Sequence, residues 1–454
     1  MKEDWYKERN KRTDGFADVK SVCHEVHATI KVTADAGHYD TQVMLKVLLN
    51  ILARWCNNIH VCCPEVRDIS EVNSTLPVSM RGLLSKIDPF GNFTFGDEAQ
   101  QGDITVFIGP PESDYLQPFI AIDSGGWISS CSFNNYGHCE KVTNDSNPLG
   151  PAMAACLANA ELFRWANSII SVPYSKWYSL YDLSVSTNSL ICPVEFSNTD
   201  LGRLHVVGCG AIGSSFTYLI NLTDLYGTLT FVDADQGVEL HNTSSSLLFT
   251  PANVGSGLTK ASLCAGYINR NFLVSEIFDG DYKNFGYKHD TPAKSAEVIL
   301  CFANDFDIWS TVQHLYPPTV FHATTSRSWG INVGRHIPLK DNCIMCTFQQ
   351  LARTKYVPVC AEGAMPQKPV EDNAADAQEP HASILPFLSP AAAVVALAEL
   401  VKYKLGKRPD ENTVQFNMST SDGVLLDDQE RAFNCAICQH QSAGIYKNLY
   451  VEAV

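Results

Sequence analysis

The sequence contains no long apolar segment. No run of apolar residues approaches the roughly 20 residues that a helix needs to cross a bilayer. The N-terminal stretch, MKEDWYKERNKRTDG, also lacks the apolar core of a secretory signal peptide. Because both features are missing, we expect a cytoplasmic protein that neither spans a membrane nor is secreted.

Positive charge is scarce as well. The 454 residues include 33 Lys and Arg against 49 Asp and Glu, which gives a formal net charge of −16 at pH 7. This balance argues against nonspecific binding to nucleic acid or to anionic membranes, and it suits a basic partner. The length allows two or three domains with sizeable cores, and the hydrophobic content of 45% is ordinary for a globular protein.

Cysteine is plentiful, but a disulfide framework is not expected. In a cytoplasmic chain of this size, 16 cysteines are better explained as core residues, metal ligands or a nucleophile. Most of them, such as Cys62, Cys63 and Cys156, lie in apolar runs that are typical of a core.

Residues 203–235 have the pattern of a nucleotide-binding strand–helix–strand unit. Two apolar runs flank a glycine signature, G-x-G-x-x-G, and a helix-like stretch. Gly208 permits a tight turn, Gly210 lets the backbone approach a phosphate, and Gly213 lets the helix pack on the strand. Asp233 ends the second apolar run, where a carboxylate would accept hydrogen bonds from ribose hydroxyls. The pattern predicts a nucleotide site, and the alternative is a Rossmann layer that binds nothing.

Two later segments add polar residues to this site. Lys260 opens a helical stretch, and a basic side chain near a phosphate loop can neutralise phosphate charge in a transition state. The alternative is a solvated surface lysine. Residues 296–307 form a buried-type strand that ends in polar and acidic residues, and such ends face the ligand in a doubly wound sheet. Asn304, Asp305 and Asp307 are therefore candidate ligands of magnesium or nucleotide.

The N-terminal half repeats the layout without the glycine signature. A strand, a helix-like stretch and three more apolar runs follow one another, so we expect an α/β domain that has lost its phosphate loop. The segments are residues 27–37, 39–56, 58–64, 104–109 and 118–123.

Two cysteine pairs have the spacing of a zinc site. Cys343 and Cys346 form one CxxC unit, and Cys435 and Cys438 form another. Four thiolates suit a closed tetrahedral zinc site, which we predict here. Two redox motifs or plain core cysteines are the alternatives.

The stretch between the pairs, residues 354–383, is polar, Pro-rich and acidic, and it contains Cys360. A thiolate near a nucleotide site can attack an activated acyl group, so Cys360 is a candidate nucleophile. Composition alone favours an incidental exposed cysteine.

Residues 203–440 resemble the ubiquitin-activating enzymes and their bacterial relatives ThiF and MoeB, which adenylate the C-terminal carboxylate of a ubiquitin-like protein. The resemblance rests on VVGCGAIGSS, on VDAD followed by Asn242, on VGSGLTKA with its Lys260, on the paired CxxC units and on VPVCAEGA. The last motif looks like the family's crossover loop, here about residues 354–385.

The resemblance implies ATP and Mg²⁺ as cofactors and structural Zn²⁺ on Cys343, Cys346, Cys435 and Cys438. It places Asp233 at the ribose and the side chains of Asn242 and Lys260 at the phosphates. The expected catalytic residues are Cys360 as the thioester-forming nucleophile, Lys260 and Arg9. The expected cofactor-binding residues are Gly208, Gly210, Gly213, Asp233, Asp235, Asn242, Lys260, Asn304 and Asp305.

The sequence departs from the family pattern in three places. Ser245 stands where the family usually has an arginine, so charge stabilisation at the α-phosphate has to come from elsewhere. The family's T-D-N strand end appears as A-N-D, which leaves the magnesium-binding aspartate open between Asp305 and Asp307. The crossover loop is long and acidic, as if it carried partner-specific contacts.

Family members act as dimers or pseudo-dimers in which one Rossmann unit is inactive and lends an N-terminal arginine to the active site. We therefore expect an α/β pseudo-dimer of two Rossmann-like halves. Residues 1–195 would be the inactive domain, residues 196–454 the active adenylation domain with its zinc site, and Arg9 or Arg12 the visiting arginine.

This layout looks like that of the activating enzymes of bacterial ubiquitin-like conjugation operons. The expected partners are a ubiquitin-like protein and a conjugating-type enzyme, and the layout also allows a homodimer. The alternative functions are a catalytically inactive scaffold that binds a ubiquitin-like protein and an NAD-dependent oxidoreductase.

Overall fold

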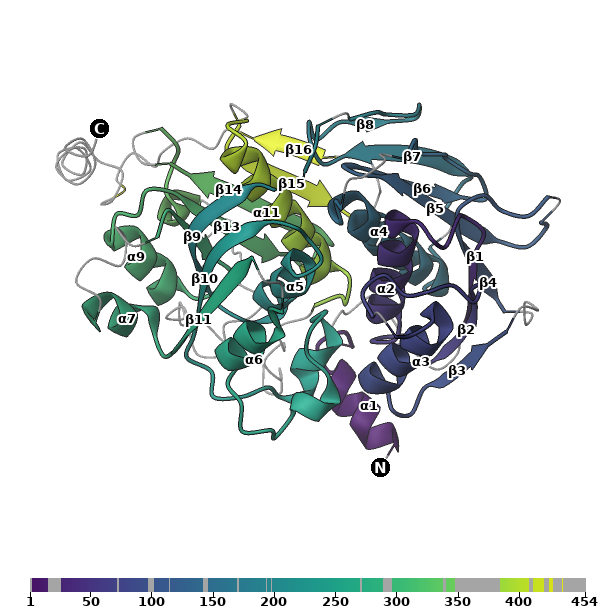
Figure 1. Cartoon of the computed structure of the whole chain (residues 1–454), viewed down its shortest axis with the longest axis horizontal. Helices are drawn as coiled ribbons and strands as arrows, with labels where there is room; N and C mark the ends of the chain where they lie inside the picture. Colours follow the sequence, from purple (N-terminus) through teal and green to yellow (C-terminus); the bar gives the residue numbers. More distant parts are fainter. Residues whose placement is uncertain are drawn as a thin grey trace, which may run out of the picture.

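The computed structural model shows an α/β protein with two mixed eight-stranded sheets, one from each half of the chain (Figure 1). This confirms the expected α/β class with two Rossmann-like halves. No helix in the described part of the chain is long and apolar enough to cross a membrane. The structure describes residues 2–14, 26–71, 73–96, 102–113, 115–141, 146–169, 171–192, 194–196, 198–269, 272–288, 296–337, 340–347, 384–407, 411–419, 424–427 and 435.

The N-terminal sheet has the strand order β3-β2-β1-β4-β5-β6-β7-β8. The first five strands in this order are parallel, and the last three are added antiparallel. Its strands are β1 (His27–Val32), β2 (Asn58–Cys62), β3 (Asn92–Phe95), β4 (Ile104–Ile108), β5 (Phe119–Gly125), β6 (Ile128–Phe133), β7 (Tyr174–Ser179) and β8 (Val185–Ser186). The helices of this half are α1 (Lys2–Asn10), α2 (Tyr39–Leu52), α3 (Leu76–Ile87) and α4 (Leu149–Ala166).

The C-terminal sheet has the order β11-β10-β9-β12-β13-β14-β15-β16, again with five parallel strands followed by three antiparallel additions. Its strands are β9 (Asp200–Val207), β10 (Tyr226–Asp233), β11 (Leu273–Asp279), β12 (Val298–Cys301), β13 (Val320–Thr325), β14 (Gly330–His336), β15 (Thr413–Asn417) and β16 (Val424–Asp427). Its helical elements are α5 (Ala211–Ile220), η1 (Leu240–Ser244), η2 (Pro251–Asn253), α6 (Lys260–Tyr267), α7 (Tyr282–Lys288), α9 (Phe306–His314) and α11 (Leu388–Lys404).

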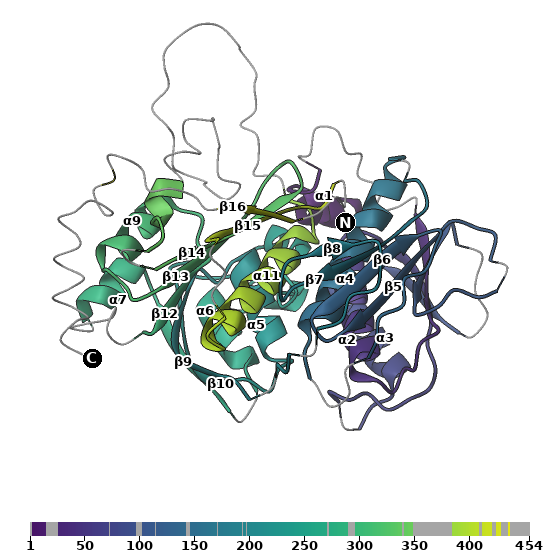
Figure 2. The same cartoon turned by 90° about the horizontal axis from the view of Figure 1, so that it is seen from above.

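The two halves meet through helices. Helices α2, α4, α5 and α11 lie between the sheets in both views (Figures 1 and 2). Helix α11 packs against α5 of its own half and against α4 of the other half. Every residue of α11 from Leu388 to Lys402 is buried, because neighbours cover the helix on all sides.

Buried polar contacts also join the halves. The guanidinium of Arg54, just beyond α2, donates hydrogen bonds to the carbonyl oxygens of Thr243 and Phe249, the latter at 2.9 Å. Asn50 of α2 donates to the carbonyl oxygen of Leu247 at 2.9 Å. Burial lowers the pKa of Arg54 to about 9. These contacts fix η1 and the segment that follows it against the N-terminal half.

The ends of the first two strands differ between the halves. Residues 33–38, which follow β1, read TADAGH and contain one glycine, Gly37, whereas β9 is followed by the G-x-G-x-x-G of residues 208–213. Strand β2 ends at Cys62, whereas β10 ends in the carboxylate of Asp233. The N-terminal half therefore has neither the glycine signature nor the carboxylate that a nucleotide needs at these strand ends.

Candidate functional site

A cleft of about 390 Å³ opens at the carboxyl ends of the central strands of the C-terminal sheet. Parallel sheets of this kind bind ligands at that edge. All the residues expected to bind cofactor line the cleft except Gly213. They are Gly208, Gly210, Asp233, Asp235, Asn242, Lys260, Asn304 and Asp305.

The three glycines have different structural roles. Gly208 has φ +93°, and a Cβ there would lie 2.4 Å from the backbone nitrogen of Ala303. A Cβ on Gly213 would lie 2.1 Å from the carbonyl oxygen of Gly208, so this glycine lets the helix start close to the loop and stays behind the cleft. A Cβ on Gly210 would meet no atom of the described residues within 4 Å. The protein itself thus makes no demand for glycine at Gly210, and the free space suits a ligand that approaches the backbone.

Helix α5 begins at this open position. Gly210 is its N-cap residue and offers no side chain to cap the helix. The first amides of a helix have no partner within the helix, and the helix dipole places positive potential there. The start of α5 can therefore bind an anion such as a phosphate.

Asp233, at the end of β10, is held by two backbone amides. Its Oδ2 accepts a hydrogen bond from the amide of Cys209 at 2.6 Å, and its Oδ1 accepts one from the amide of Asp235 at 2.8 Å. Burial raises the pKa of Asp233 above its usual range. Because each carboxylate oxygen has two acceptor sites, both oxygens can still accept a hydrogen bond from a sugar hydroxyl.

Lys260 is the first residue of α6, which Thr259 caps by accepting a hydrogen bond from the amide of Ser262 at 3.1 Å. The Lys260 ammonium forms an ion pair with Asp235, whose side chain is largely exposed. Asp235 thus tethers a buried lysine beside the phosphate loop, a role that its sequence position does not reveal.

Asp305 is the acidic residue of the 304–307 segment that lines the cleft; Asp307 is exposed and does not. Oδ1 of Asp305 accepts from the amides of Asp307 at 2.8 Å and Ile308 at 3.1 Å and so caps α9. Within the described part of the chain, its Oδ2 has no hydrogen-bond donor and can accept a ligand. Together with Asn304 it offers the oxygen donors that Mg²⁺ prefers, so these residues fit that ion.

The two N-terminal arginines have different surroundings. Arg9 is buried and paired with Asp88 at 3.1 Å, away from the cleft lining. Arg12 lines the cleft. Its carbonyl oxygen accepts from the amide of Ile384 at 3.1 Å, and Thr13 donates to the carbonyl oxygen of Ile384 at 3.3 Å. Because α1 also packs against η1, the segment after α1 reaches the C-terminal half.

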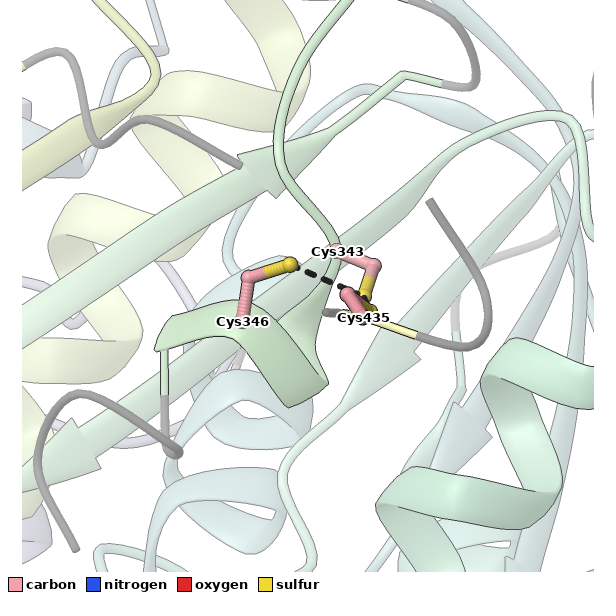
Figure 3. A group of neighbouring side chains, drawn as sticks. All are labelled: Cys343, Cys346 and Cys435. Atoms are coloured by element: carbon pink, nitrogen blue, oxygen red, sulfur yellow. Dashed lines mark hydrogen bonds between the residues drawn. The ribbon is translucent and has the colours of Figure 1, made fainter. Parts of the chain in front are cut away.

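Three of the four expected zinc ligands come together. The sulfur atoms of Cys343, Cys346 and Cys435 lie within 4.8 Å of one another and point toward a common centre (Figure 3). The Cys343 sulfur is 3.6 Å from that of Cys346 and 3.4 Å from that of Cys435. Cys438 lies outside the described residues. Buried thiols at this spacing fit the donor set of structural zinc.

Cys360 also lies outside the described residues, as do residues 354–383 around it. Cys209, the cysteine of the phosphate loop, is fully buried, and burial raises its pKa well above the ordinary value. Burial likewise raises the pKa of Cys301 to about 12. Such thiols stay protonated and are poor nucleophiles.

Sequence reasoning missed several residues of the cleft. Gly280, Asp281 and Tyr282 follow the end of β11, Thr324 and Thr325 end β13, and Ser389 opens α11. The strand ends could have been found by extending the carboxyl-edge rule to every parallel strand. Ser389 carries no local signal, because helix packing brings it to the cleft.

The chain is similar to a known protein family over its C-terminal half. Residues 189–436, more than half of the chain, match the ThiF family. No curated protein is significantly similar to the chain. Among solved structures, E. coli MccB with ATP is 16% identical, with 54% of this chain and 68% of that chain covered and a TM-score of 0.38. E. coli MccB with AMPCPP and MccA is 17% identical, with the same coverage and TM-score. On the strength of the match over residues 189–436, the chain belongs to the ThiF family.

Proposed function

We propose that the chain binds ATP and Mg²⁺ in the C-terminal cleft and adenylates the C-terminal carboxylate of a ubiquitin-like protein. One observation carries the proposal. The glycine loop, the uncapped start of α5, Asp233, Lys260 and Asp305 all border one cleft, and the Cβ position of Gly210 is open. Family membership supports an enzyme that acts by adenylation.

Each group would have a defined task in this reaction. Asp233 accepts hydrogen bonds from the ribose hydroxyls, and the first amides of α5 bind the phosphates. The partner's carboxylate oxygen attacks the α-phosphorus, the bond to pyrophosphate breaks, and an acyl-adenylate forms. Lys260 and Arg12 offset the negative charge on the phosphates, so catalysis is mainly positioning and electrostatics. Mg²⁺ on Asp305 and Asn304 would neutralise the departing pyrophosphate.

The N-terminal half would then be the inactive member of a pseudo-dimer. Its sheet repeats the order and directions of the C-terminal sheet, but its strand ends lack the glycines and the carboxylate. Its contribution would be the segment carrying Arg12 and the contacts from Arg54 that brace the region after η1. We propose residues 1–195 and 196–454 as the two domains.

Arg12, rather than Arg9, is the arginine we assign to the reaction. We expect Arg12→Ala to slow adenylation about 100-fold, the loss typical of one charged donor at a transition state, without lowering Tm. Arg9→Ala should lower the free energy of unfolding by about 3–5 kcal/mol, because it leaves the buried carboxylate of Asp88 without its cationic partner. ATP–pyrophosphate exchange well below both Tm values and thermal unfolding measure the two effects. Wild-type exchange in Arg12→Ala would contradict the assignment.

Cys360 is the proposed nucleophile of a second step. Its thiolate would attack the acyl carbon of the adenylate and release AMP, leaving a thioester for transfer to a conjugating-type enzyme. We expect Cys360→Ala to keep ATP–pyrophosphate exchange but lose a thiol-reducible adduct with the ubiquitin-like partner, seen on non-reducing gels. Cys209→Ala is the control and should keep the adduct. An adduct that persists in Cys360→Ala would refute the role.

The assay that tests the proposal is ATP–pyrophosphate exchange in the presence of a ubiquitin-like protein with a free C-terminus. Exchange that depends on this protein supports adenylation. A scaffold and an NAD-dependent oxidoreductase would show no exchange, and NAD binding in place of ATP would indicate the latter. Failure of exchange with every ubiquitin-like protein encoded beside the chain's own gene would overturn the proposal.

A further inference from the structure

Two serine hydroxyls in the cleft are buried without a hydrogen-bond partner. Ser245 is 1% exposed and Ser389 is fully buried, yet both line the cleft. Neither Oγ has a partner among the described residues. Ser245 holds the position where the family pattern has an arginine.

Both residues line the same cleft as Gly210 and Ala211 at the start of α5. Ser245 precedes Ser246, whose Oγ lies 2.7 Å from the Oγ of Ser214 in the first turns of α5. Ser389 is in the first turn of α11, which packs along α5 (Figures 1 and 2). Two elements far apart in the sequence thus bring hydroxyls to the place where an anion would bind.

A buried hydroxyl without a partner destabilises a protein, so native structures keep few of them. The neighbouring hydroxyls are paired: Ser244 donates to the carbonyl oxygen of His241 at 2.9 Å, and Ser214 donates to that of Gly210 at 2.6 Å. Buried hydroxyls without a partner among the described residues also occur at Thr41, Thr75 and Ser124, away from the cleft. Around the start of α5, however, the two that lack a partner are the two that border the cleft. A bound ligand with oxygen acceptors would satisfy them.

We infer that Ser245 and Ser389 donate hydrogen bonds to non-bridging oxygens of the nucleotide's phosphoryl groups. This inference rests on the proposed function and deepens it. The two serine hydroxyls would supply hydrogen bonds that the family's arginine supplies elsewhere. The positive charge that such an arginine would bring comes here from Lys260 and Arg12. The two unsatisfied hydroxyls raise the free energy of the nucleotide-free protein, and nucleotide binding removes this destabilisation.

The test compares Ser245→Ala and Ser389→Ala with wild type. Without nucleotide, each variant should have an unchanged or higher Tm, because an unpaired buried hydroxyl has been removed. In titration calorimetry with Mg²⁺, each should bind ATP about tenfold more weakly and adenosine with unchanged affinity, because the lost bond is to a charged phosphoryl oxygen. Ser244→Ala is the control. It should lower Tm, since its hydroxyl is paired, and leave ATP affinity unchanged.

Several results would overturn the inference. ATP affinity at the wild-type level in both variants would show that the hydroxyls do not contact the nucleotide. An equal loss of affinity for ATP and for adenosine would show that the hydroxyls contact the nucleoside and not the phosphates. A fall in Tm like that of Ser244→Ala would show that the hydroxyls are paired within the protein. Wild-type protein that binds no ATP would instead refute the proposed function.

Discussion

Replacing Asp233 with alanine is expected to abolish ATP binding, raising Kd at least about 100-fold, since hydrogen bonds to a charged group contribute about 1.5–3 kcal/mol each. Lys260→Ala should still bind ATP but form adenylate far more slowly. The difference arises because ribose contacts are equal in the ground and transition states, whereas charge on the phosphates changes during displacement. Titration calorimetry and ATP–pyrophosphate exchange measure the two effects.

Asp200 provides the matched control for Asp233. Its Oδ1 also accepts a hydrogen bond from the amide two residues later, at 2.8 Å, but it lies at the start of β9, away from the cleft. Asp200→Ala should keep wild-type ATP affinity. If Asp233→Ala also kept it, the ribose assignment would be wrong.

Cys435→Ser is expected to have the largest effect on stability. Three buried thiols surround a common centre, and a structural zinc there would contribute folding free energy directly, about 10–16 kcal/mol in zinc-finger peptides. We expect wild-type protein to contain about one zinc per chain and the variant to lose the metal and much of its cooperative unfolding transition. Elemental analysis and thermal unfolding provide the measurements.

Cys301→Ser is the comparison for this experiment. Cys301 is a buried cysteine of β12 and is not one of the clustered thiols. Its variant should keep the zinc and lose stability only to the extent expected for a polar atom in the core. Fully folded wild-type protein without metal would contradict the zinc site.

The nucleotide cleft was largely predictable because its signals are local. Strand ends, glycine spacing and the carboxylate after the second strand all fall within residues 203–235. The approach of Cys343, Cys346 and Cys435 to one another was equally predictable, because the CxxC spacing that indicates it is local to each pair. Cys343 and Cys435 meet across 92 residues, as a shared zinc ion would require.

Contacts between distant segments could not be read from the sequence. Arg9 and Arg12 are both charged residues near the N-terminus, and only Asp88, far along the chain, decides that Arg9 is buried in an ion pair. Ser389 reaches the cleft through the packing of α11. The repeated layout was expected, but the three antiparallel strands added to each sheet appear only in the structure.

The number of nucleotides bound per chain tests the central claim most directly. We expect titration calorimetry with ATP and Mg²⁺ to show a single site in wild-type protein and none in Asp233→Ala, because only the C-terminal half has the glycine loop and the carboxylate. Two sites per chain, or one site that survives in Asp233→Ala, would show that nucleotide binds elsewhere and would contradict the account.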